Sequence, residues 1–182
     1  RTTDGFRSFY SLDLPLISET NTLTNTYNYK YFDELYENNI STFSILLKST
    51  NSLTGDDVKL SERLFIPSNR LRGFVKGKVG PKDGDDFIGG NFVTALNFAS
   101  TLPQVLPNMQ NIDISVFIDA ANVWGVDYDS SIDDDGKIRS SVGLGVDWFT
   151  MIGPLNFTFS HPVTKETSDK TETFRFKIGT TF

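Results

Sequence analysis

The sequence has no cysteine and a single histidine, His161. It therefore has no disulfide framework and no thiolate metal ligand, and one imidazole without a second His does not make a transition-metal site. No apolar run approaches the roughly 20 residues that a membrane-spanning helix requires. Basic residues are also in deficit. The net charge of −6 leaves no basic stripe to neutralise phosphates, so nucleic acid is excluded as a partner.

Aromatic and small polar residues are abundant instead, with 16 Phe beside many Thr, Asn and Ser, whereas Ala and Met are scarce. This composition disfavours an α-rich domain and suits β-structure. Apolar and polar residues alternate with a period of two, which separates the two faces of a strand and would scatter on a helix. The pattern predicts an all-β antiparallel protein of about eight strands, each long enough for a tilted membrane strand of roughly 9–11 residues.

The last strand shows this alternation most clearly. Phe174, Phe176, Ile178 and Phe182 share one face, and Gly179 lies on the other face with Arg175 and Lys177. One earlier strand has an exception, since Leu46 breaks its alternation. The other predicted strands cover residues 6–14, 27–31, 43–47, 92–98, 112–119, 142–148 and 155–160.

The connections between these strands favour a membrane barrel. Residues 33–39 and 150–152 are short links and residues 50–90 and 125–139 are long ones, as in barrels with short turns on one side and long loops on the other. The link at 100–111 fits this less well. A soluble antiparallel sandwich is the alternative. Against it, one set of faces is almost purely apolar and ends in aromatic residues, while the other carries Gly, Ser, Asp, Arg and Lys, as a wet lumen would.

A charged residue in the longest connection, Arg72, precedes a glycine and an aromatic residue. An arbitrary Arg-Gly pair is usually a solvated loop charge. If the loop folds back into the lumen, however, the guanidinium can grip a carboxylate with two hydrogen bonds. Asp119 and Asp113 lie on the lumen face of a predicted strand and are the candidate partners.

Several segments resemble, in order, the motifs of the Omp85 family of outer-membrane barrels, and the matches run from about residue 66 to 182. Leu71, Arg72, Gly73 and Phe74 resemble the family's (V/L)RGF motif. Ala121 stands where the family's aromatic-x-Asp-x-Gly motif ends in glycine, and Pro67-Ser68-Asn69 replaces a usual Gly-Gly pair. The further matching segments are Val79-Gly80-Pro81, Gly89-Gly90-Asn91, Phe117-Ile118-Asp119-Ala120-Ala121, Gly153-Pro154-Leu155-Asn156-Phe157, His161-Pro162 and the closing strand at 173–182.

The resemblance implies an antiparallel transmembrane β-barrel fragment. Residues 1–182 would form the C-terminal half of a sixteen-stranded barrel, with an inward-folding loop at about 50–90 and with the first half and the POTRA repeats outside this chain. It also implies that Arg72 pairs with Asp119 on the lumen wall. Asn97 takes the place of an acidic residue that assists this pair in many barrel-assembly members; it can accept a hydrogen bond but cannot neutralise charge.

The resemblance further implies that the closing strand, with Phe174, Phe176, Ile178, Gly179 and Phe182, is the β-signal. An edge strand must pair with something in lipid, so an opening seam would offer a template to an incoming strand. Gly179 either favours a bend or fraying there, or fills a lumen position that needs a small residue.

The function implied is that of the barrel-assembly members: templating the folding and insertion of other barrels in the outer membrane of a Gram-negative bacterium. The partners implied are membrane lipids, unfolded outer-membrane protein clients and assembly-machine lipoproteins. Two alternatives stay open: a related Omp85 translocation or secretion barrel (TamA-like or two-partner secretion), and a self-contained small barrel with a structural or adhesin role. No carboxylate pairs with an apolar pocket, so no enzyme, metal or cofactor is expected. The acidic segment 127–136 lacks the spacing of a calcium loop and is expected to be a solvated outer loop.

The membrane prediction is testable on the chain itself. Because its apolar strand faces would meet water, the purified fragment should aggregate without detergent and disperse in it. Size-exclusion chromatography with light scattering measures this; a monodisperse soluble monomer would favour the sandwich.

Overall fold

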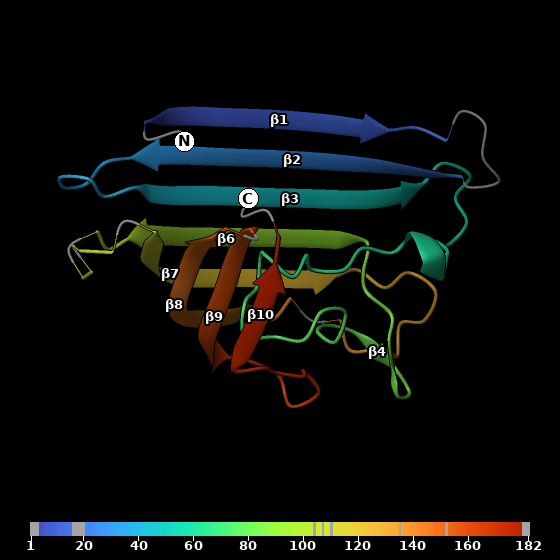
Figure 1. The fold of residues 1–182 in the computed structure, drawn as a ribbon. Helices are drawn as coiled ribbons and strands as arrows, with labels where there is room; N and C mark the ends of the chain where they lie inside the picture. Colours follow the sequence, from blue (N-terminus) through green and yellow to red (C-terminus); the bar gives the residue numbers. More distant parts are fainter. Residues whose placement is uncertain are drawn as a thin grey trace.

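The computed structural model describes residues 4–15, 21–103, 105–106, 108–109, 111–134, 136–151 and 153–179. Its main element is an eight-stranded antiparallel sheet in the order β1-β2-β3-β6-β7-β8-β9-β10, a meander in which only the long connection between β3 and β6 carries further elements (Figure 1). The predicted all-β antiparallel architecture of about eight strands is confirmed. The strands are β1 Gly5–Asp13, β2 Thr22–Asp33, β3 Ser41–Ser52, β6 Phe92–Thr101, β7 Ile112–Trp124, β8 Arg139–Thr150, β9 Gly153–Thr164 and β10 Phe174–Ile178.

The sheet is curved and open. In Figure 1 the strands β1 to β3 lie side by side along nearly the same axis with alternating direction, and β8 to β10 cross that axis at a steep angle below them. The sheet order begins with β1 and ends with β10, and these two strands do not pair with each other in the described part of the chain. A self-contained eight-stranded barrel requires that pairing, whereas a part of a larger barrel does not. The open sheet is therefore consistent with a barrel fragment.

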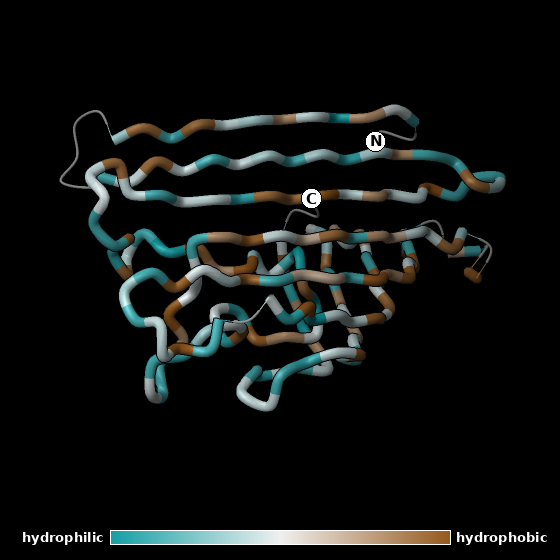
Figure 2. Tube along the Cα trace, turned by 180° about the vertical axis from the view of Figure 1, so that it is seen from behind, coloured by the Kyte–Doolittle hydropathy of each residue, from teal (hydrophilic) through white to brown (hydrophobic). Residues whose placement is uncertain are grey.

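The two faces of the sheet reverse the arrangement of a water-soluble protein. Large apolar residues on the convex face are exposed, with Ile118 at 55% and Leu144 at 47% of their full exposure. The polar residues next to them in the alternation are buried on the concave face, where Asp119 and Ser141 are both at 0%. Figure 2 shows the apolar and polar residues alternating along the strands. Lipid outside and a polar interior explain this sidedness.

The concave face is covered by the connection between β3 and β6, residues 53–91, which we call the inward loop. It contains the short 3-10 helix η1 (Leu60–Glu62) and a small hairpin of β4 (Lys82–Asp83) and β5 (Asp86–Phe87). Its apolar side chains pack on the sheet in one cluster, and Leu46, the exception to the alternation of β3, belongs to it. Strand alternation puts Leu46 on the concave face with Ser44, and an apolar residue fits there because the loop covers it. The cluster consists of Leu46, Leu64, Ile66, Leu71, Phe74, Val79, Val93, Ala95, Ala121 and Val123.

Connections at the two ends of the sheet differ in length. Since successive strands are antiparallel, the inward loop lies at the same end as residues 14–21, 125–138 and 165–173. The opposite end has residues 34–40, 102–111 and 151–152. Among the described residues, no helix has the length and apolar character that crossing a membrane requires.

The closing strand is shorter than the sequence pattern indicates. It ends at Ile178, and Phe182 lies outside the described residues. Gly179 has a φ of +128°, which residues with a side chain rarely adopt. A Cβ at Gly179 would meet no described atom within 4 Å. The positive φ is typical of a bend directly after β10, and the role of Gly179 stays a prediction.

Candidate functional site

The inward loop is fixed to the lumen wall by a forked ion pair. Arg72 donates from Nε to Asp119 Oδ2 and from Nη2 to Asp119 Oδ1, both at 2.7 Å. The Arg72 backbone N–H donates to Asp119 Oδ2 at 3.0 Å. Asp119 lies on β7 with a fully buried side chain, and the Arg72 side chain is 22% exposed. Two parallel charge-assisted bonds fix both the distance and the plane of the guanidinium. Asp113, the other candidate partner, lies near the opposite end of β7.

An aromatic ring supports the guanidinium from the wall. The Cζ atom of Arg72 lies 3.5 Å from the centroid of the Phe117 ring, which is a cation–π contact. Phe117 lies two residues before Asp119, so both point into the lumen. Opposite Phe117 on β8 is Gly143, where an added Cβ would come within 2.5 Å of the Phe117 ring. The missing side chain at Gly143 thus leaves room for the ring beneath Arg72.

The turn after Arg72 depends on Gly73. Its φ is +89°, and an added Cβ would lie 3.2 Å from Ser160 Cβ and 3.4 Å from Ser141 Cβ on the wall. Both the backbone conformation and the close approach to two strands favour glycine. The main chain then turns so that Phe74, with 1% exposure, enters the apolar cluster. Burying such a side chain contributes roughly 1.5–3 kcal/mol.

A second arginine in the loop, Arg70, extends the polar network. It donates from Nη1 to Asn97 Oδ1 at 3.1 Å and to Ser44 Oγ at 2.7 Å, and from Nη2 to Asn28 Oδ1 at 2.9 Å. Asn97 in turn donates from Nδ2 to Asp119 Oδ1 and to the Arg70 carbonyl, both at 2.8 Å. Asn97, expected from the resemblance to stand beside the Arg72–Asp119 pair, contacts that pair through Asp119. Asn97 bonds to Asp119 and Arg70, and it bridges the two arginine sites.

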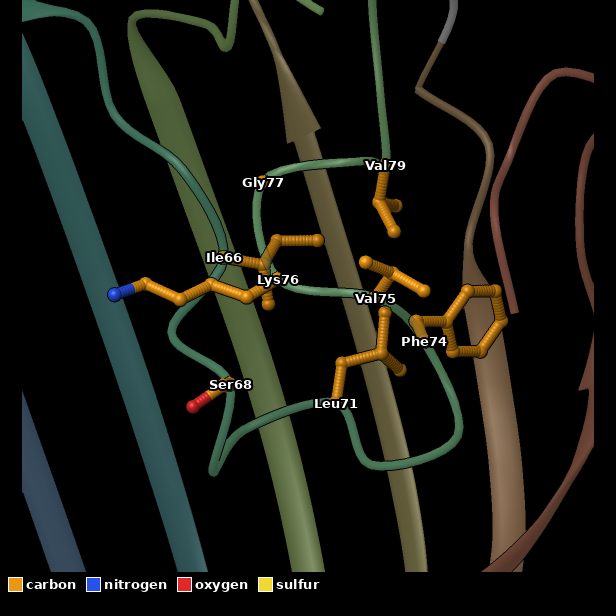
Figure 3. Close-up of a pocket in the computed structure, with 8 residues that line it drawn as sticks. All are labelled: Ile66, Ser68, Leu71, Phe74, Val75, Lys76, Gly77 and Val79. Carbon is orange, nitrogen blue, oxygen red and sulfur yellow. The ribbon is translucent and has the colours of Figure 1, made fainter. Parts of the chain in front are cut away.

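The apolar side of the loop leaves little free space. Figure 3 shows Ile66, Leu71, Val75 and Val79 turned toward a common centre, with Lys76 directed away from it. The pocket between them has a volume of about 10 Å³. Such a volume holds at most about one water molecule, so the cluster packs the loop and does not offer a ligand site.

Asp127, which directly follows β7 in the acidic segment, anchors the start of the loop. It accepts hydrogen bonds from Val58 N–H at 2.9 Å and Asn91 Nδ2 at 2.8 Å, and it pairs with the buried Arg63. Burial by itself would raise the pKa of Asp127, but these hydrogen bonds and the charge of Arg63 outweigh it and lower the pKa below its ordinary value. Asp127 thus anchors the loop, while residues 127–131 are exposed, as the sequence predicts for this segment.

A further anchor comes from the connection between β9 and β10. Asp169 accepts from Gly80 N–H at 3.2 Å and pairs with Arg139 Nε at 2.9 Å, and both ionic side chains are buried. Gly80 has a φ of +104°, and an added Cβ would lie 2.4 Å from Val123. The part of the inward loop around Gly80 is therefore in close contact with the wall of the sheet.

The structure brings the predicted residues Leu71, Arg72, Gly73, Phe74, Asp119 and Asn97 together, whereas Phe174, Phe176 and Ile178 lie on the membrane face of β10. Their functional roles stay predictions. Sequence reasoning missed Arg63, Arg70 and Asp127, because a buried arginine has no sequence pattern of its own. The described residues contain no group of three or more metal-ligating side chains. This arrangement holds the inward loop against the wall of the sheet.

The fold and the anchors together define an outer-membrane β-barrel with an inward-folded loop. The Omp85 superfamily domain matches residues 2–182, so the chain belongs to the Omp85 superfamily. It is 27% identical over 192 residues to the outer membrane protein assembly factor BamA of Neisseria meningitidis (86% of this chain, 23% of that protein). It is 29% identical over 144 residues to BamA of Neorickettsia risticii (76% and 19%).

A solved structure is similar over almost the whole chain. The crystal structure of BamA from Haemophilus ducreyi lacking POTRA domains 1–3 superposes with a TM-score of 0.82 at 27% identity, covering 95% of this chain and 38% of that one. The chain thus spans about a quarter or less of the length of the curated relatives. The predicted family resemblance, nearest to the barrel-assembly members, is confirmed. The chain belongs to the outer membrane of a Gram-negative bacterium.

The ion pair between Arg72 and Asp119 leads to a prediction for the double variant. In the complete membrane-embedded protein, Arg72→Ala leaves the Asp119 charge buried without its cation and should destabilise the docked loop by about 3–5 kcal/mol. Asp119→Ala should also destabilise it, and the double variant should cost little more than either. Thermal unfolding in lipid bilayers measures the coupling; strictly additive effects would rule out a direct pair.

The anchor at Asp127 predicts acid sensitivity. A lowered folded-state pKa contributes stability that is complete above the ordinary pKa of about 3.9 and is lost as the pH falls through the folded value. Hydrogen exchange of residues 58–63 should therefore rise on acidification below about pH 4. In Asp127→Asn, hydrogen exchange of these residues should no longer rise on acidification. In Asp129→Asn, which changes a residue of the same segment that is hydrogen-bonded to Ser131, the rise should remain. The same rise in Asp127→Asn as in the unchanged protein would contradict the assignment.

Proposed function

We propose that the protein containing this chain folds and inserts other β-barrels into the outer membrane. In this proposal the eight strands form the C-terminal half of a sixteen-stranded barrel. Membership of the Omp85 superfamily and similarity to proteins named as outer membrane protein assembly factors support it. The clients are unfolded outer-membrane proteins, and membrane lipids and assembly lipoproteins are the further partners.

The observation that carries the proposal is the edge strand β10. It ends the sheet order next to β9, and in the sixteen-stranded barrel of this proposal its other edge meets the first strand at a seam. When that seam opens, the backbone groups on the edge of β10 have no hydrogen-bonding partner in lipid, so they favour pairing with another strand. A client strand can use this edge as a template by β-augmentation. The protein then lowers the barrier to insertion without bond chemistry, metal or cofactor.

The membrane face of β10 suits such a template. Phe174 packs against Phe159 and Phe176 against Phe157, each pair with ring centroids 5.1 Å apart. These pairs lie on the convex face, so the side chains next to this edge face the lipid. A client strand paired with β10 would extend the sheet and its lipid-facing apolar surface by one strand.

The alternative within the family, a translocation or secretion barrel, needs a path through the lumen. In the described part of the chain the inward loop covers the concave face of β3 and β6 to β9 through its anchors and its apolar cluster. A polypeptide passing there would require the loop to leave. This arrangement favours the edge over the lumen as the route of the client.

Cross-linking distinguishes the two routes, and the absence of cysteine from the chain simplifies it. Ile178→Cys places a thiol at the end of β10, and Ser115→Cys places one on the lumen side of β7. With the complete protein in lipid vesicles and an unfolded barrel client carrying one cysteine, insertion predicts disulfide bonds at position 178. Bonds mainly at position 115 would overturn the proposal in favour of translocation.

A further inference from the structure

The closing strand is held by an unusually short ladder. It forms five residue pairs with β9, extended by one backbone hydrogen bond at each end, from Ser160 N–H to Thr173 O and from Gly179 N–H to Pro154 O. Every other neighbouring pair in the eight-stranded sheet has nine to twelve residue pairs. Within the described residues, β10 therefore has fewer backbone pairs to its neighbour than any other strand of this sheet.

A side chain on the lumen face of β10 adds to this attachment. Arg175 donates from Nη1 to the Ser68 carbonyl at 2.7 Å and from Nη2 to the Phe74 carbonyl at 2.8 Å, and it forms an ion pair with Glu172. Its side chain is only 15% exposed. Ser68 and Phe74 lie on either side of Arg72, so one guanidinium spans the turn of the loop that carries the fork to Asp119.

The segment before β10 is joined to the same turn through the backbone. Glu172 N–H donates to Gly73 O at 3.0 Å, and Val75 N–H donates to Lys170 O at 2.9 Å. Phe74 and Thr171 also form an isolated β-bridge. Residues 170–175 and residues 68–75 are consequently one hydrogen-bonded unit that reaches from the lumen to the edge of the sheet.

We infer that Arg175 is a positioning residue that couples the closing strand to the inward loop, so that release of the β10 edge and undocking of the loop at Arg72 occur together. A guanidinium is suited to this because its planar fork reaches two carbonyls at once, whereas an ammonium acts as a point charge. The inference rests on the proposed function for its biological meaning. The coupling itself is a property of the protein without client.

Hydrogen exchange of the complete protein in lipid nanodiscs tests the coupling. Arg175→Met removes two hydrogen bonds to a charged group, which should speed amide exchange about tenfold to a hundredfold in residues 174–178 and also in residues 70–75. Arg175→Lys keeps a positive charge but loses the fork, and it should show most of the effect; it carries the test if Arg175→Met does not fold. Lys177→Met is the matched control, since Lys177 lies on the same face of β10 and makes no hydrogen bond to the loop within the described residues.

A thermodynamic cycle separates coupling from local stabilisation. Undocking the loop with Arg72→Ala should speed exchange in β10 when Arg175 is present, and should add little in the Arg175→Met background. If Arg72→Ala speeds exchange in β10 equally in both backgrounds, or if Arg175→Met changes β10 alone, the inference is overturned. Client insertion rates are measured separately: coupled exchange with no insertion activity would refute the proposed function and leave the coupling standing.

Discussion

The carboxylate of Asp119 has no contact with solvent, and the loop architecture depends on how its charge is compensated. A buried anion is tolerated only when it is paired and its lone pairs are filled. Oδ2 accepts from the backbone and Nε of Arg72, and Oδ1 accepts from Arg72 Nη2 and Asn97 Nδ2. One carboxylate thus fixes the main chain and the side chain of the loop together, which leaves little freedom for the turn at Gly73.

The chain has an unusual division of apolar surface. One set of apolar residues faces outward from the strands, where lipid takes the place of a core. A second set, on the inward loop, builds a true core against the lumen wall around Leu71 and Phe74. The loop is therefore held by apolar packing as well as by the ion pair of Arg72. Its position is fixed by packing on one side and by ion pairs on the other.

The strand pattern and the Arg72–Asp119 contact could be anticipated from the sequence for different reasons. Period-two alternation is a local property, so all eight strands could be located from it, although β2, β3 and β7 extend up to five residues beyond the predicted ranges. The contact between Arg72 and Asp119 is non-local and came from the resemblance to a family motif. Leu46 looked anomalous because its neighbour, the loop, comes later in the chain. Arg175 and Arg63 could not be assigned, since their acceptors include backbone carbonyls, which no residue type identifies.

The inward loop comes before most of its charged partners in the sequence, and this order affects when the loop can dock during folding. The carboxylates that hold the inward loop, Asp119, Asp127 and Asp169, all lie downstream of it, as does Arg175. During vectorial delivery of the chain, the loop therefore precedes its own counter-ions. Arg70 can bond to Asn28 and Ser44 once β2 and β3 are in place, but Arg72 cannot reach Asp119 before β7 has joined the sheet, and the last bonds of the loop require β10. Closure of the interior therefore depends on the arrival of β10, which brings Arg175 to the loop.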